Sequence, residues 1–413
     1  GDSFTNNLLT DLAPILALFG EQVTKQFLSQ TITWYDCVIF AIFPLGIITT
    51  VVSAIRVAAP NSWKALVGRA RESRAMAELE LLSSTSLEVC EMWDGQAIVR
   101  VMGSPQILEL VYVKERKDKK ECGLYTLRDE SERETKHAAD VETQRHSQPL
   151  EGFDGTDGAP APNISLNLAP PPYSRKQSLL WFVAFAASLQ LGVLVFCAMA
   201  IYHPPWIPRF RKDGSPVVGS AYPVAAAGII TTTVGMFLCA WIIEQSTKEE
   251  AWQAKAEEST STAGAAPAEP QVHILWLQQR KIVNDQSFDS YAIFAPGLRD
   301  CILTSRRDEN MGSHGRTPQQ SGDSMVELSG PHQKLAIIGA VTTIVGFTLS
   351  FSGLRLMHWS ATMAQFVGTA IMTCVRIWLR RDLAGRPDAQ WVLDGYEMDW
   401  LALELAARGE SLW

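Results

Sequence analysis

The longest hydrophobic runs of this sequence contain almost no charged side chains. Residues 178–244 form two apolar arms joined by a polar turn, and the first arm has Gln190 as its one strongly polar residue. Each arm meets the requirement of roughly 20 apolar residues for crossing a bilayer as a helix. Because lipid offers the backbone no hydrogen-bonding partner, each arm must be a complete helix. The sequence therefore predicts an integral membrane protein, with the lipid bilayer as its first partner.

An excess of positive charge and clustered cysteines are both missing. The net charge of -8 argues against a nucleic-acid partner, for which a basic face is expected. The seven cysteines are scattered, without a CxxC pair or a Cys/His cluster, and are interpreted as reduced thiols. The sequence also lacks the common nucleotide-binding, metalloprotease and hydrolase motifs. We therefore expect no catalytic, cofactor-binding or metal-binding residues, and no enzymatic activity.

Long apolar runs are present in three places, and they predict about five transmembrane helices. The first helix is expected at 34–57, where Pro44 should produce a kink. The other four form hairpins at 178–244 and 334–380. A mean hydropathy of only +0.03 for the whole chain requires these spans to alternate with long hydrophilic segments.

The distribution of Lys and Arg predicts the orientation of these spans, because cytosolic flanks are enriched in both residues. The first span has Lys25 as the one cation in the twenty residues before it. Five cations follow that span: Arg56, Lys64, Arg69, Arg71 and Arg74. The last span is followed by a similar cluster, so the N-terminus is expected to be extracytosolic and the C-terminus cytosolic, in the plasma membrane or an endomembrane. Three cations at 203–220 favour the opposite orientation locally.

The hydrophilic segments predict a small cytosolic α+β module. Ser62 is expected to cap a helix that continues to about Leu82, and Asp94-Gly95 is typical of a turn. Four strand-like runs are found at 97–102, 107–113, 272–277 and 290–294. The first two and the last two can share one sheet, since both loops are expected on the same side of the membrane.

The predicted fold class is thus an α-helical integral membrane protein with about five transmembrane helices, a small cytosolic α+β module and disordered loops. The remaining segments are an amphipathic N-terminal helix (1–33), the α+β segment (58–113), a disordered linker (114–177), a second linker (245–270), a strand-rich segment (271–302), a third linker (303–330) and a cytosolic tail (381–413). The N-terminal helix is expected to lie in the membrane interface, and packing against the bundle is the alternative. The tail resembles an amphipathic helix that needs a partner.

The linker 114–177 contains two short motifs. Pro170, Pro171 and Tyr173 belong to a PPxY pattern, which WW domains bind in polyproline II form. A WW-domain adaptor of a ubiquitin ligase is therefore a candidate partner, although a proline-rich linker also produces this pattern by chance. Asn163-Ile164-Ser165 matches a glycosylation acceptor, and a cytosolic location would leave it unmodified.

Three spans contain a related octamer with small residues seven apart and paired threonines. Its candidate helix-packing residues are Gly46, Thr49, Thr50, Gly228, Thr231, Thr232, Gly235, Gly339, Thr342, Thr343 and Gly346. Small residues on one face allow helices to approach closely, and threonine hydroxyls can bond a neighbouring helix or their own carbonyls. Helix packing is the preferred interpretation; a substrate or ion pathway is the alternative.

Several stretches carry a resemblance to a known group of proteins. They are 20–28, 69–74, 287–294 and the final span from Met357-His358-Trp359-Ser360 to Arg381. The chain resembles uncharacterised multi-pass membrane proteins of filamentous fungi, some of which continue into ankyrin repeats. No ankyrin repeat is found in these residues, and the resemblance supplies no catalytic motif.

Two functional hypotheses follow from the sequence, and a membrane enzyme is a third that only a cluster of titratable groups at the membrane surface would support. The first is a non-enzymatic membrane scaffold or receptor that presents a cytosolic module to protein partners. The second is a transporter or channel for an uncharged solute, with the threonine-bearing faces lining its path. The spans contain almost no ionisable residues, which disfavours coupling to protons or ions. Threonines gathered around one cavity would favour the second hypothesis, and threonines wedged between helices the first.

Overall fold

The computed structural model describes residues 20–31, 33–103, 107–113, 123–126, 162–168, 176–212, 215–253, 272–283, 285–299, 301–307, 330–381 and 386–408. The chain divides into two compact units, each built from three separate stretches. The helical unit comprises Gly1–Ser83, Pro172–Lys248 and Arg307–Asp382. The sheet unit comprises Ser84–Pro171, Glu249–Arg306 and Leu383–Trp413.

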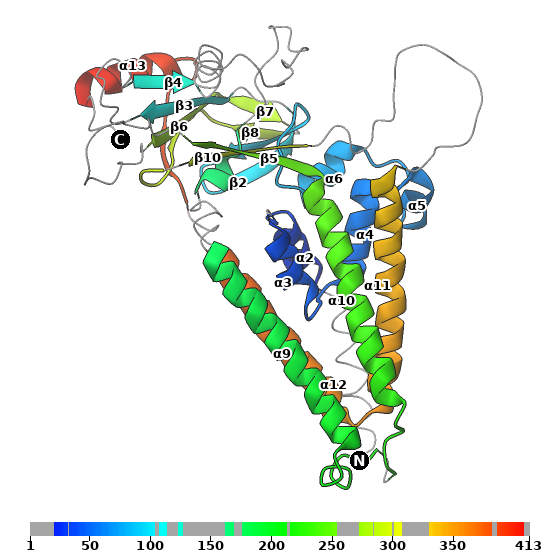
Figure 1. Ribbon diagram of the computed structural model, residues 1–413. Helices are drawn as coiled ribbons and strands as arrows, with labels where there is room; N and C mark the ends of the chain where they lie inside the picture. The colour runs from blue at the N-terminus through cyan, green and yellow to red at the C-terminus, as the bar shows by residue number, and fades with distance from the viewer. Residues whose placement is uncertain are drawn as a thin grey trace, which may run out of the picture. The chain divides into compact units, whose positions relative to one another are not determined.

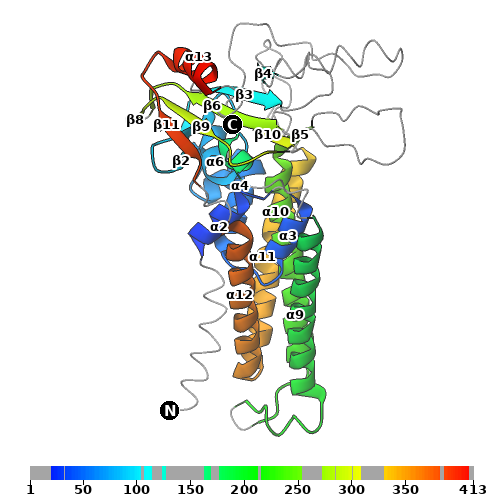
Figure 2. The same ribbon diagram turned by 90° about the vertical axis from the view of Figure 1, so that its left-hand side faces the viewer.

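Four helices of the helical unit are long and apolar enough to cross a membrane. They are α9 (Lys176–Tyr202), α10 (Ala221–Gln245), α11 (Pro331–Leu356) and α12 (Trp359–Arg380). Helix α10 packs along α11, and α9 packs along α12 (Figures 1 and 2). These helices correspond to the two hairpins that the sequence predicts at 178–244 and 334–380.

The predicted transmembrane helix at 34–57 is wrong, so among the described residues there are four long spans and not five. Two short helices are found there, α3 (Trp34–Ala41) and α4 (Ile47–Ala58), with 8 and 12 residues. At 1.5 Å per residue, each is far shorter than the roughly 30 Å of a hydrocarbon core. The predicted kink at Pro44 is instead a complete break. Helix α3 ends at Ala41, and Ile42, Phe43 and Gly46 are not in the right-handed helical conformation.

The segments that flank α3 and α4 also differ from the prediction. Helix α2 (Glu21–Leu28) buries Phe27 and Leu28 against the helical core, as in the alternative that packs this segment on the bundle. The single helix predicted from Ser62 to Leu82 is replaced by α5 (Asn61–Leu66) and α6 (Arg74–Leu81). Ser73 caps α6, since its hydroxyl accepts a hydrogen bond from the Met76 N–H, and this cap starts a new helix.

The sheet unit contains a five-stranded antiparallel sheet in the order β11-β9-β6-β3-β4. Its strands are β3 (Ile107–Val113), β4 (Gly123–Thr126), β6 (Val272–Gln278), β9 (Tyr291–Phe294) and β11 (Asp388–Trp391). Strand β3 pairs with β6 over their whole length, so two segments far apart in the sequence share one sheet, as the sequence predicts for 107–113, 272–277 and 290–294. The predicted strand at 97–102 is not part of this sheet and forms a separate hairpin. Strand β11 from the tail extends the same sheet.

Smaller strand pairs complete the sheet unit. Strands β1 (Val89–Trp93) and β2 (Ile98–Met102) form a hairpin around Asp94, whose carboxylate accepts hydrogen bonds from two backbone N–H groups of the turn. Strands β7 (Lys281–Val283) and β8 (Gln286–Phe288) form a second hairpin. Strand β10 (Cys301–Arg307) pairs with β5 (Thr247–Gln253).

Both faces of the five-stranded sheet are covered by side chains of the unit itself. One face packs Trp276 and Ile274 against Ile164 of the short helix α8 (Ile164–Leu168) and against β10. The other face packs Leu275 and Leu277 against Leu401 of α13 (Glu397–Arg408). Helix α13 therefore finds in its own sheet the partner that the tail was expected to need (Figure 1).

Three of the segments expected to be linkers contain regular structure. Helix α8 and strand β4 lie within 114–177, β5 begins within 245–270, and β10 continues past residue 303. The prediction missed them because each is a short run that includes polar residues. Asn163, next to α8, is an example of a polar residue that is buried. Its side chain is 2% exposed and bonds the backbone N–H and the hydroxyl of Ser305, so its amide serves the fold.

Candidate functional site: a broken helix and a buried cavity

The conformation of residues 42–46 causes the break between α3 and α4. Phe43 and Gly46 adopt positive φ angles of 56° and 69°, and Pro44 between them has no backbone N–H. A side chain at Gly46 would overlap that of Thr24, whose hydroxyl donates a hydrogen bond to the Leu45 carbonyl. This position therefore accepts glycine alone, on both conformational and steric grounds.

Arg376 of α12 supplies the hydrogen bonds that the break takes away. Its Nη2 atom lies 3.1, 2.9, 2.7 and 3.0 Å from the carbonyl oxygens of Ile39, Phe40, Ile42 and Phe43. The guanidinium group is 2% exposed and also lies over the Phe40 ring, at 5.5 Å from its centroid. The C-terminus of a helix carries unpaired carbonyls and a partial negative charge, so a donor-only cation is the matching group. Arg376 lies near the end of the last predicted span, and the structure shows it buried within the unit.

A capping box and an ion pair hold the first turn of α3. Thr33 and Asp36 form a reciprocal capping box at its first turn. Asp36 is buried, and its carboxylate lies 3.1 Å from Nη2 of Arg380, one turn beyond Arg376 on α12. Arg380 in turn stacks over the Phe27 ring at 4.7 Å. Helix α3 is thus held to the last turns of α12 at both of its ends.

The segment α3–α4 enters and leaves at the same end of the helical unit. The Asp36–Arg380 pair places the start of α3 beside the C-terminus of α12. Ile55 and Ala58 of α4 pack on Ala336, close to the N-terminus of α11. Since α11 and α12 form an antiparallel hairpin, these two termini lie at one end. The segment is therefore re-entrant, a form that non-spanning backbone adopts where it is buried in protein.

Ion pairs connect the end of α4 to α2 and to two glutamates that follow α5. Arg56 is 2% exposed and forms ion pairs with Glu72 and Glu80, at 2.5 and 2.8 Å. Lys25 of α2 reaches the same Glu80 at 3.3 Å. Burial disfavours ionisation of Glu80, yet the hydrogen bond and charge of Arg56, together with Lys25, lower the pKa of this carboxyl. Helix α2 therefore lies beside the end of α4.

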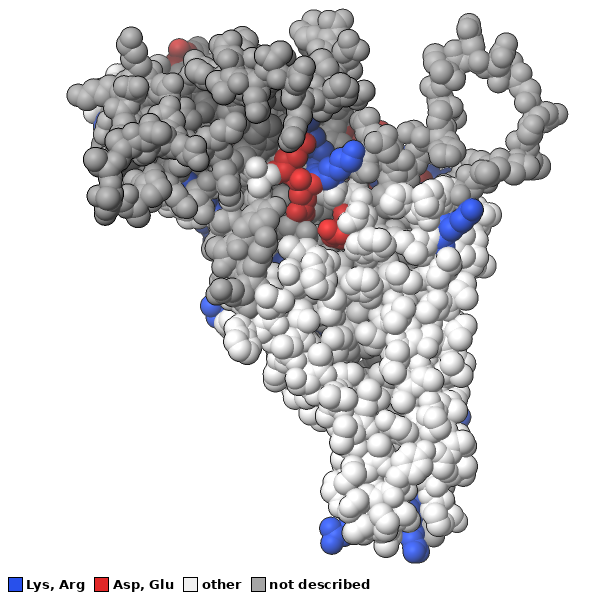
Figure 3. All heavy atoms as spheres, in the orientation of Figure 1, with Lys and Arg blue, Asp and Glu red and all other residues white. Residues whose placement is uncertain are grey.

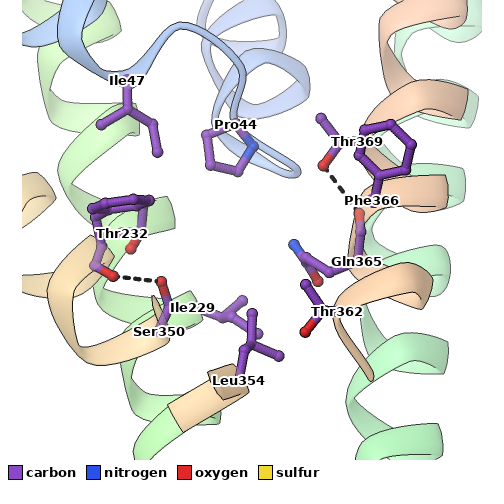
Figure 4. A pocket seen from close by; sticks show the side chains of 11 residues that line it. Pro44, Ile47, Ile229, Thr232, Ser350, Leu354, Thr362, Gln365, Phe366 and Thr369 are labelled. Atoms are coloured by element: carbon purple, nitrogen blue, oxygen red, sulfur yellow. Dashed lines mark hydrogen bonds between the residues drawn. The ribbon is translucent and has the colours of Figure 1, made fainter. Parts of the chain in front are cut away.

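A cavity of about 50 Å³ lies below the break, between α10, α11 and α12 (Figure 4). A single water needs about 10–15 Å³ on this measure, so the cavity holds several small-molecule atoms. Its polar lining consists of Thr232, Ser350, Thr362, Gln365 and Thr369. Its apolar lining consists of Pro44, Ile47, Ile229, Phe347, Leu354 and Phe366. None of these residues is charged, and Figure 3 shows the outer face of the long helices uncharged between their ends.

The second and third octamers face each other along α10 and α11. A Cβ atom added at Gly228, Gly235 or Gly346 would come within 3.0 Å of the backbone of the opposite helix. Gly339 is less crowded, with Cys239 atoms at 3.2 Å. The first octamer is not part of this interface, because Gly46 lies at the break of the re-entrant segment. The three copies therefore do not converge on one place.

The paired threonines have different surroundings. Thr50, Thr232 and Thr343 are buried, and each hydroxyl bonds the carbonyl one turn earlier, at 3.0, 2.8 and 2.7 Å. Their neighbours Thr49, Thr231 and Thr342 are half-buried. Of all six, Thr232 alone lines the cavity. The threonines are therefore neither all gathered around the cavity, as a pathway would require, nor all wedged between helices, as packing alone would require.

Sequence reasoning missed the residues of α12 that line the cavity. Gln190, noted as the polar residue of its arm, lies with its Nε2 3.4 Å from Oε1 of Gln365. The available signal was the spacing of Thr362, Gln365, Thr369 and Arg376, which places four polar groups on one face of an otherwise apolar helix. A polar stripe in a span faces protein or a cavity and not lipid.

The remaining candidate residues give no second site. Pro170, Pro171 and Tyr173 lie outside the described residues. Within the described parts of the chain, no three His, Cys, Asp or Glu side chains are grouped so that they could hold a metal ion. No protein-family model, curated protein or solved structure matches this chain. The resemblance to fungal multi-pass proteins stays a prediction.

Proposed function

We propose that this chain is a non-enzymatic membrane protein whose helical unit anchors the sheet unit at one membrane face, where it acts as a scaffold or receptor for protein partners. One observation carries the proposal. Strands β3, β6 and β11 come from three separate stretches of chain, yet they belong to one sheet. Two long apolar helices separate each stretch from the next. Two crossings return a chain to the side from which it left, so this arrangement is the one in which such a sheet can form.

The proposed orientation places the sheet unit in the cytosol. Arg56, Lys64, Arg69, Arg71 and Arg74 follow the re-entrant segment, on the side where the sheet unit is connected. The opposite hairpin ends carry fewer cations, namely Arg209, Arg211, Lys212 and Arg355. By the positive-inside rule the first group marks the cytosolic side. The re-entrant segment moves residues 20–33 to this side too, which replaces the extracytosolic N-terminus expected from five spans.

Cysteine accessibility tests the arrangement in sealed membrane vesicles of known sidedness. Four exposed positions are replaced one at a time in a background that lacks Cys374, the exposed cysteine of the described residues, and Cys122, which lies outside them: Glu21, Leu66, Ile282 and Val218. A membrane-impermeant maleimide should label Glu21→Cys, Leu66→Cys and Ile282→Cys from the cytosolic side and Val218→Cys from the other. Labelling of Leu66→Cys and Ile282→Cys from opposite sides would overturn the shared sheet. Labelling of Glu21→Cys together with Val218→Cys would restore the five-span arrangement.

The alternative function, a transporter or channel for an uncharged solute, has the cavity as its supporting observation. It requires a path across the membrane, whereas Thr50 and Thr343 are wedged between helices. Purified chain reconstituted in liposomes should not accelerate the shrinking or swelling of vesicles in glycerol or urea gradients. Acceleration that disappears in a Gln365→Leu variant would replace the scaffold proposal with the alternative.

The PPxY pattern remains a proposed contact for a WW-domain adaptor of a ubiquitin ligase. Replacing Tyr173 with Ala should abolish pulldown by a WW domain and slow ubiquitin-dependent turnover, because the tyrosine fills the specificity pocket of such grooves. Unchanged turnover would leave the pattern as a chance product of a proline-rich segment.

A further inference from the structure

The cavity below the re-entrant segment contains a buried polar group without a hydrogen-bonding partner. Thr362 is 1% exposed, and its Oγ1 atom has no hydrogen-bonding partner. In Figure 4 this oxygen is directed into the cavity, opposite Leu354. A buried hydroxyl without a partner destabilises the fold, because it has lost its hydrogen bonds to water. Either the helices bear this cost permanently, or a molecule in the cavity completes the hydrogen bond.

A second polar group next to the cavity is also incomplete. The Gln190 amide gives its Nε2 to Gln365, while its own Oε1 has no partner although it is buried. The Gln365 amide projects into the cavity beside Thr362 (Figure 4). The two glutamines and Thr362 therefore form a polar strip at a depth where lipid supplies no hydrogen bonds. An occupant that bonds Thr362 and Gln365 would give the Thr362 hydroxyl its missing partner.

The remaining hydroxyls offer acceptors. Thr232, Ser350 and Thr369 donate to the carbonyls of Gly228, Phe347 and Gln365, at 2.8, 2.9 and 3.0 Å. Each donation uses the single hydroxyl hydrogen and leaves lone pairs on the oxygen. The cavity thus presents more acceptors than donors, and its complement is a molecule with several hydrogen-bond donors.

The charge and size of the occupant follow from the lining. No charged side chain lines the cavity, and an ion buried there without a partner would cost far more than a neutral molecule. The volume of about 50 Å³ corresponds to roughly three or four waters, so it matches a molecule of about four heavy atoms. We infer that this cavity is a binding site for a small uncharged molecule rich in hydrogen-bond donors, of the class of urea, held by Thr362 and Gln365. This inference goes beyond scaffolding and does not require passage across the membrane.

The test uses the full chain in lipid nanodiscs, with Cys374→Ser to remove the exposed thiol of the described residues and Cys122→Ser to remove the cysteine that lies outside them. Thr362→Cys places a thiol in the cavity, and Val218→Cys, exposed in the turn between α9 and α10, is the control. A small uncharged methanethiosulfonate should modify both. Urea should slow modification of Thr362→Cys alone, about fourfold at a concentration three times its dissociation constant, because only empty sites react. Acetate and methylammonium of similar size should have no effect.

Three results would overturn the inference. They are an inert Thr362→Cys, equal protection by charged and uncharged probes, and equal protection of the Val218→Cys control. If Thr362→Cys does not fold, Gln365→Cys gives the same measurement from the neighbouring turn. A Thr362→Val variant adds an independent readout, since it removes the hydroxyl and keeps the shape. In that variant, the saturation-transfer NMR signal of urea should fall at least about threefold relative to the parent chain, a loss of roughly 0.7 kcal/mol in binding. An unchanged signal would remove Thr362 from the site.

Discussion

The two units repair interrupted backbone hydrogen bonding with different side chains. In the helical unit, the carbonyls at the end of α3 are met by the guanidinium group of Arg376. In the sheet unit, Asn167 bonds both the N–H and the carbonyl of Leu303, at 2.8 and 2.9 Å. A helix C-terminus offers acceptors alone, so a donor-only group fits it. A strand edge offers donors and acceptors in turn, so an amide, which is both, fits it.

The two units also differ in the size of the residues that they pack together. Helices α10 and α11 approach so closely that their glycines face the opposite backbone. The sheet unit instead fills its two faces with large side chains such as Trp276. In the proposed membrane location, lipid removes the hydrophobic gain from burying large residues between helices, so close backbone contact becomes the stabilising interaction. In water, burial of apolar area remains the driving force.

The largest expected effect is at Arg376. Replacing it with Leu removes the guanidinium group that lies within hydrogen-bond distance of four buried carbonyls, and we expect a loss of about 3 kcal/mol in the helical unit. Thermal unfolding in detergent and the yield of monodisperse protein measure this loss. Arg381→Leu, at an exposed position at the end of α12, is the control and should change little. Equal behaviour of the two variants would mean that the break needs no buried cation.

The second effect concerns the approach of α10 and α11. Gly346→Ala adds a Cβ atom against the Thr232 backbone, and we expect the helices to separate at a cost of about 3 kcal/mol. Gly192→Ala on α9 is the matched control, because nothing lies within 4 Å of its added Cβ atom. This control should gain up to about 1 kcal/mol from the higher helix propensity of alanine. Similar melting temperatures for both variants would contradict the close packing.

The third effect tests the amide repair in the sheet unit. Asn167→Ala removes both hydrogen bonds to Leu303, and the expected loss is about 2 kcal/mol. Hydrogen exchange should accelerate in β10, while the exchange of α10 and α11 stays unchanged. Gln286→Ala, which truncates an exposed amide of β8, serves as the control. Faster exchange in both units would show that they do not unfold separately.

The smallest effect is a pH dependence confined to the sheet unit. Burial raises the pKa of Glu109 from 4.5 to about 7, against the hydrogen bond donated by the Trp276 Nε1 atom at 3.0 Å. A raised carboxyl pKa means that the folded unit holds the proton more firmly than the unfolded chain. Stability should therefore fall as the pH rises from about 4.5 to about 7 and then level off.

Glu109→Gln should abolish this pH dependence. The glutamine keeps an acceptor for Trp276 and carries no charge, so the sheet unit should gain about 1–2 kcal/mol at pH 8, the carboxyl being partly open to water. Hydrogen exchange of β3 and β6 at pH 5 and pH 8 measures the difference. Equal protection of the parent chain at both pH values would contradict the raised pKa of Glu109.

Much of this fold is readable from the sequence, and the exceptions share one cause. Long apolar runs with few charges located α9 to α12, and strand-like runs located β3, β6 and β9, because these signals reside within each element. The re-entrant segment was taken for a span because its 24 residues are apolar enough in total. Its return depends on Pro44 together with a cation more than 300 residues away, and no local pattern contains that pairing.

The sequence by itself determined which stretches avoid water, which pair as strands, and that glycine recurs where helices meet. Only the tertiary structure decided that residues 34–57 turn back, that Arg376 is buried at their break, and that Thr362 and Gln365 border a cavity. The physical reason is that hydrophobicity and strand patterns are properties of neighbouring residues. Hydrogen-bond satisfaction of a broken backbone depends instead on which distant side chain folding brings within about 3 Å.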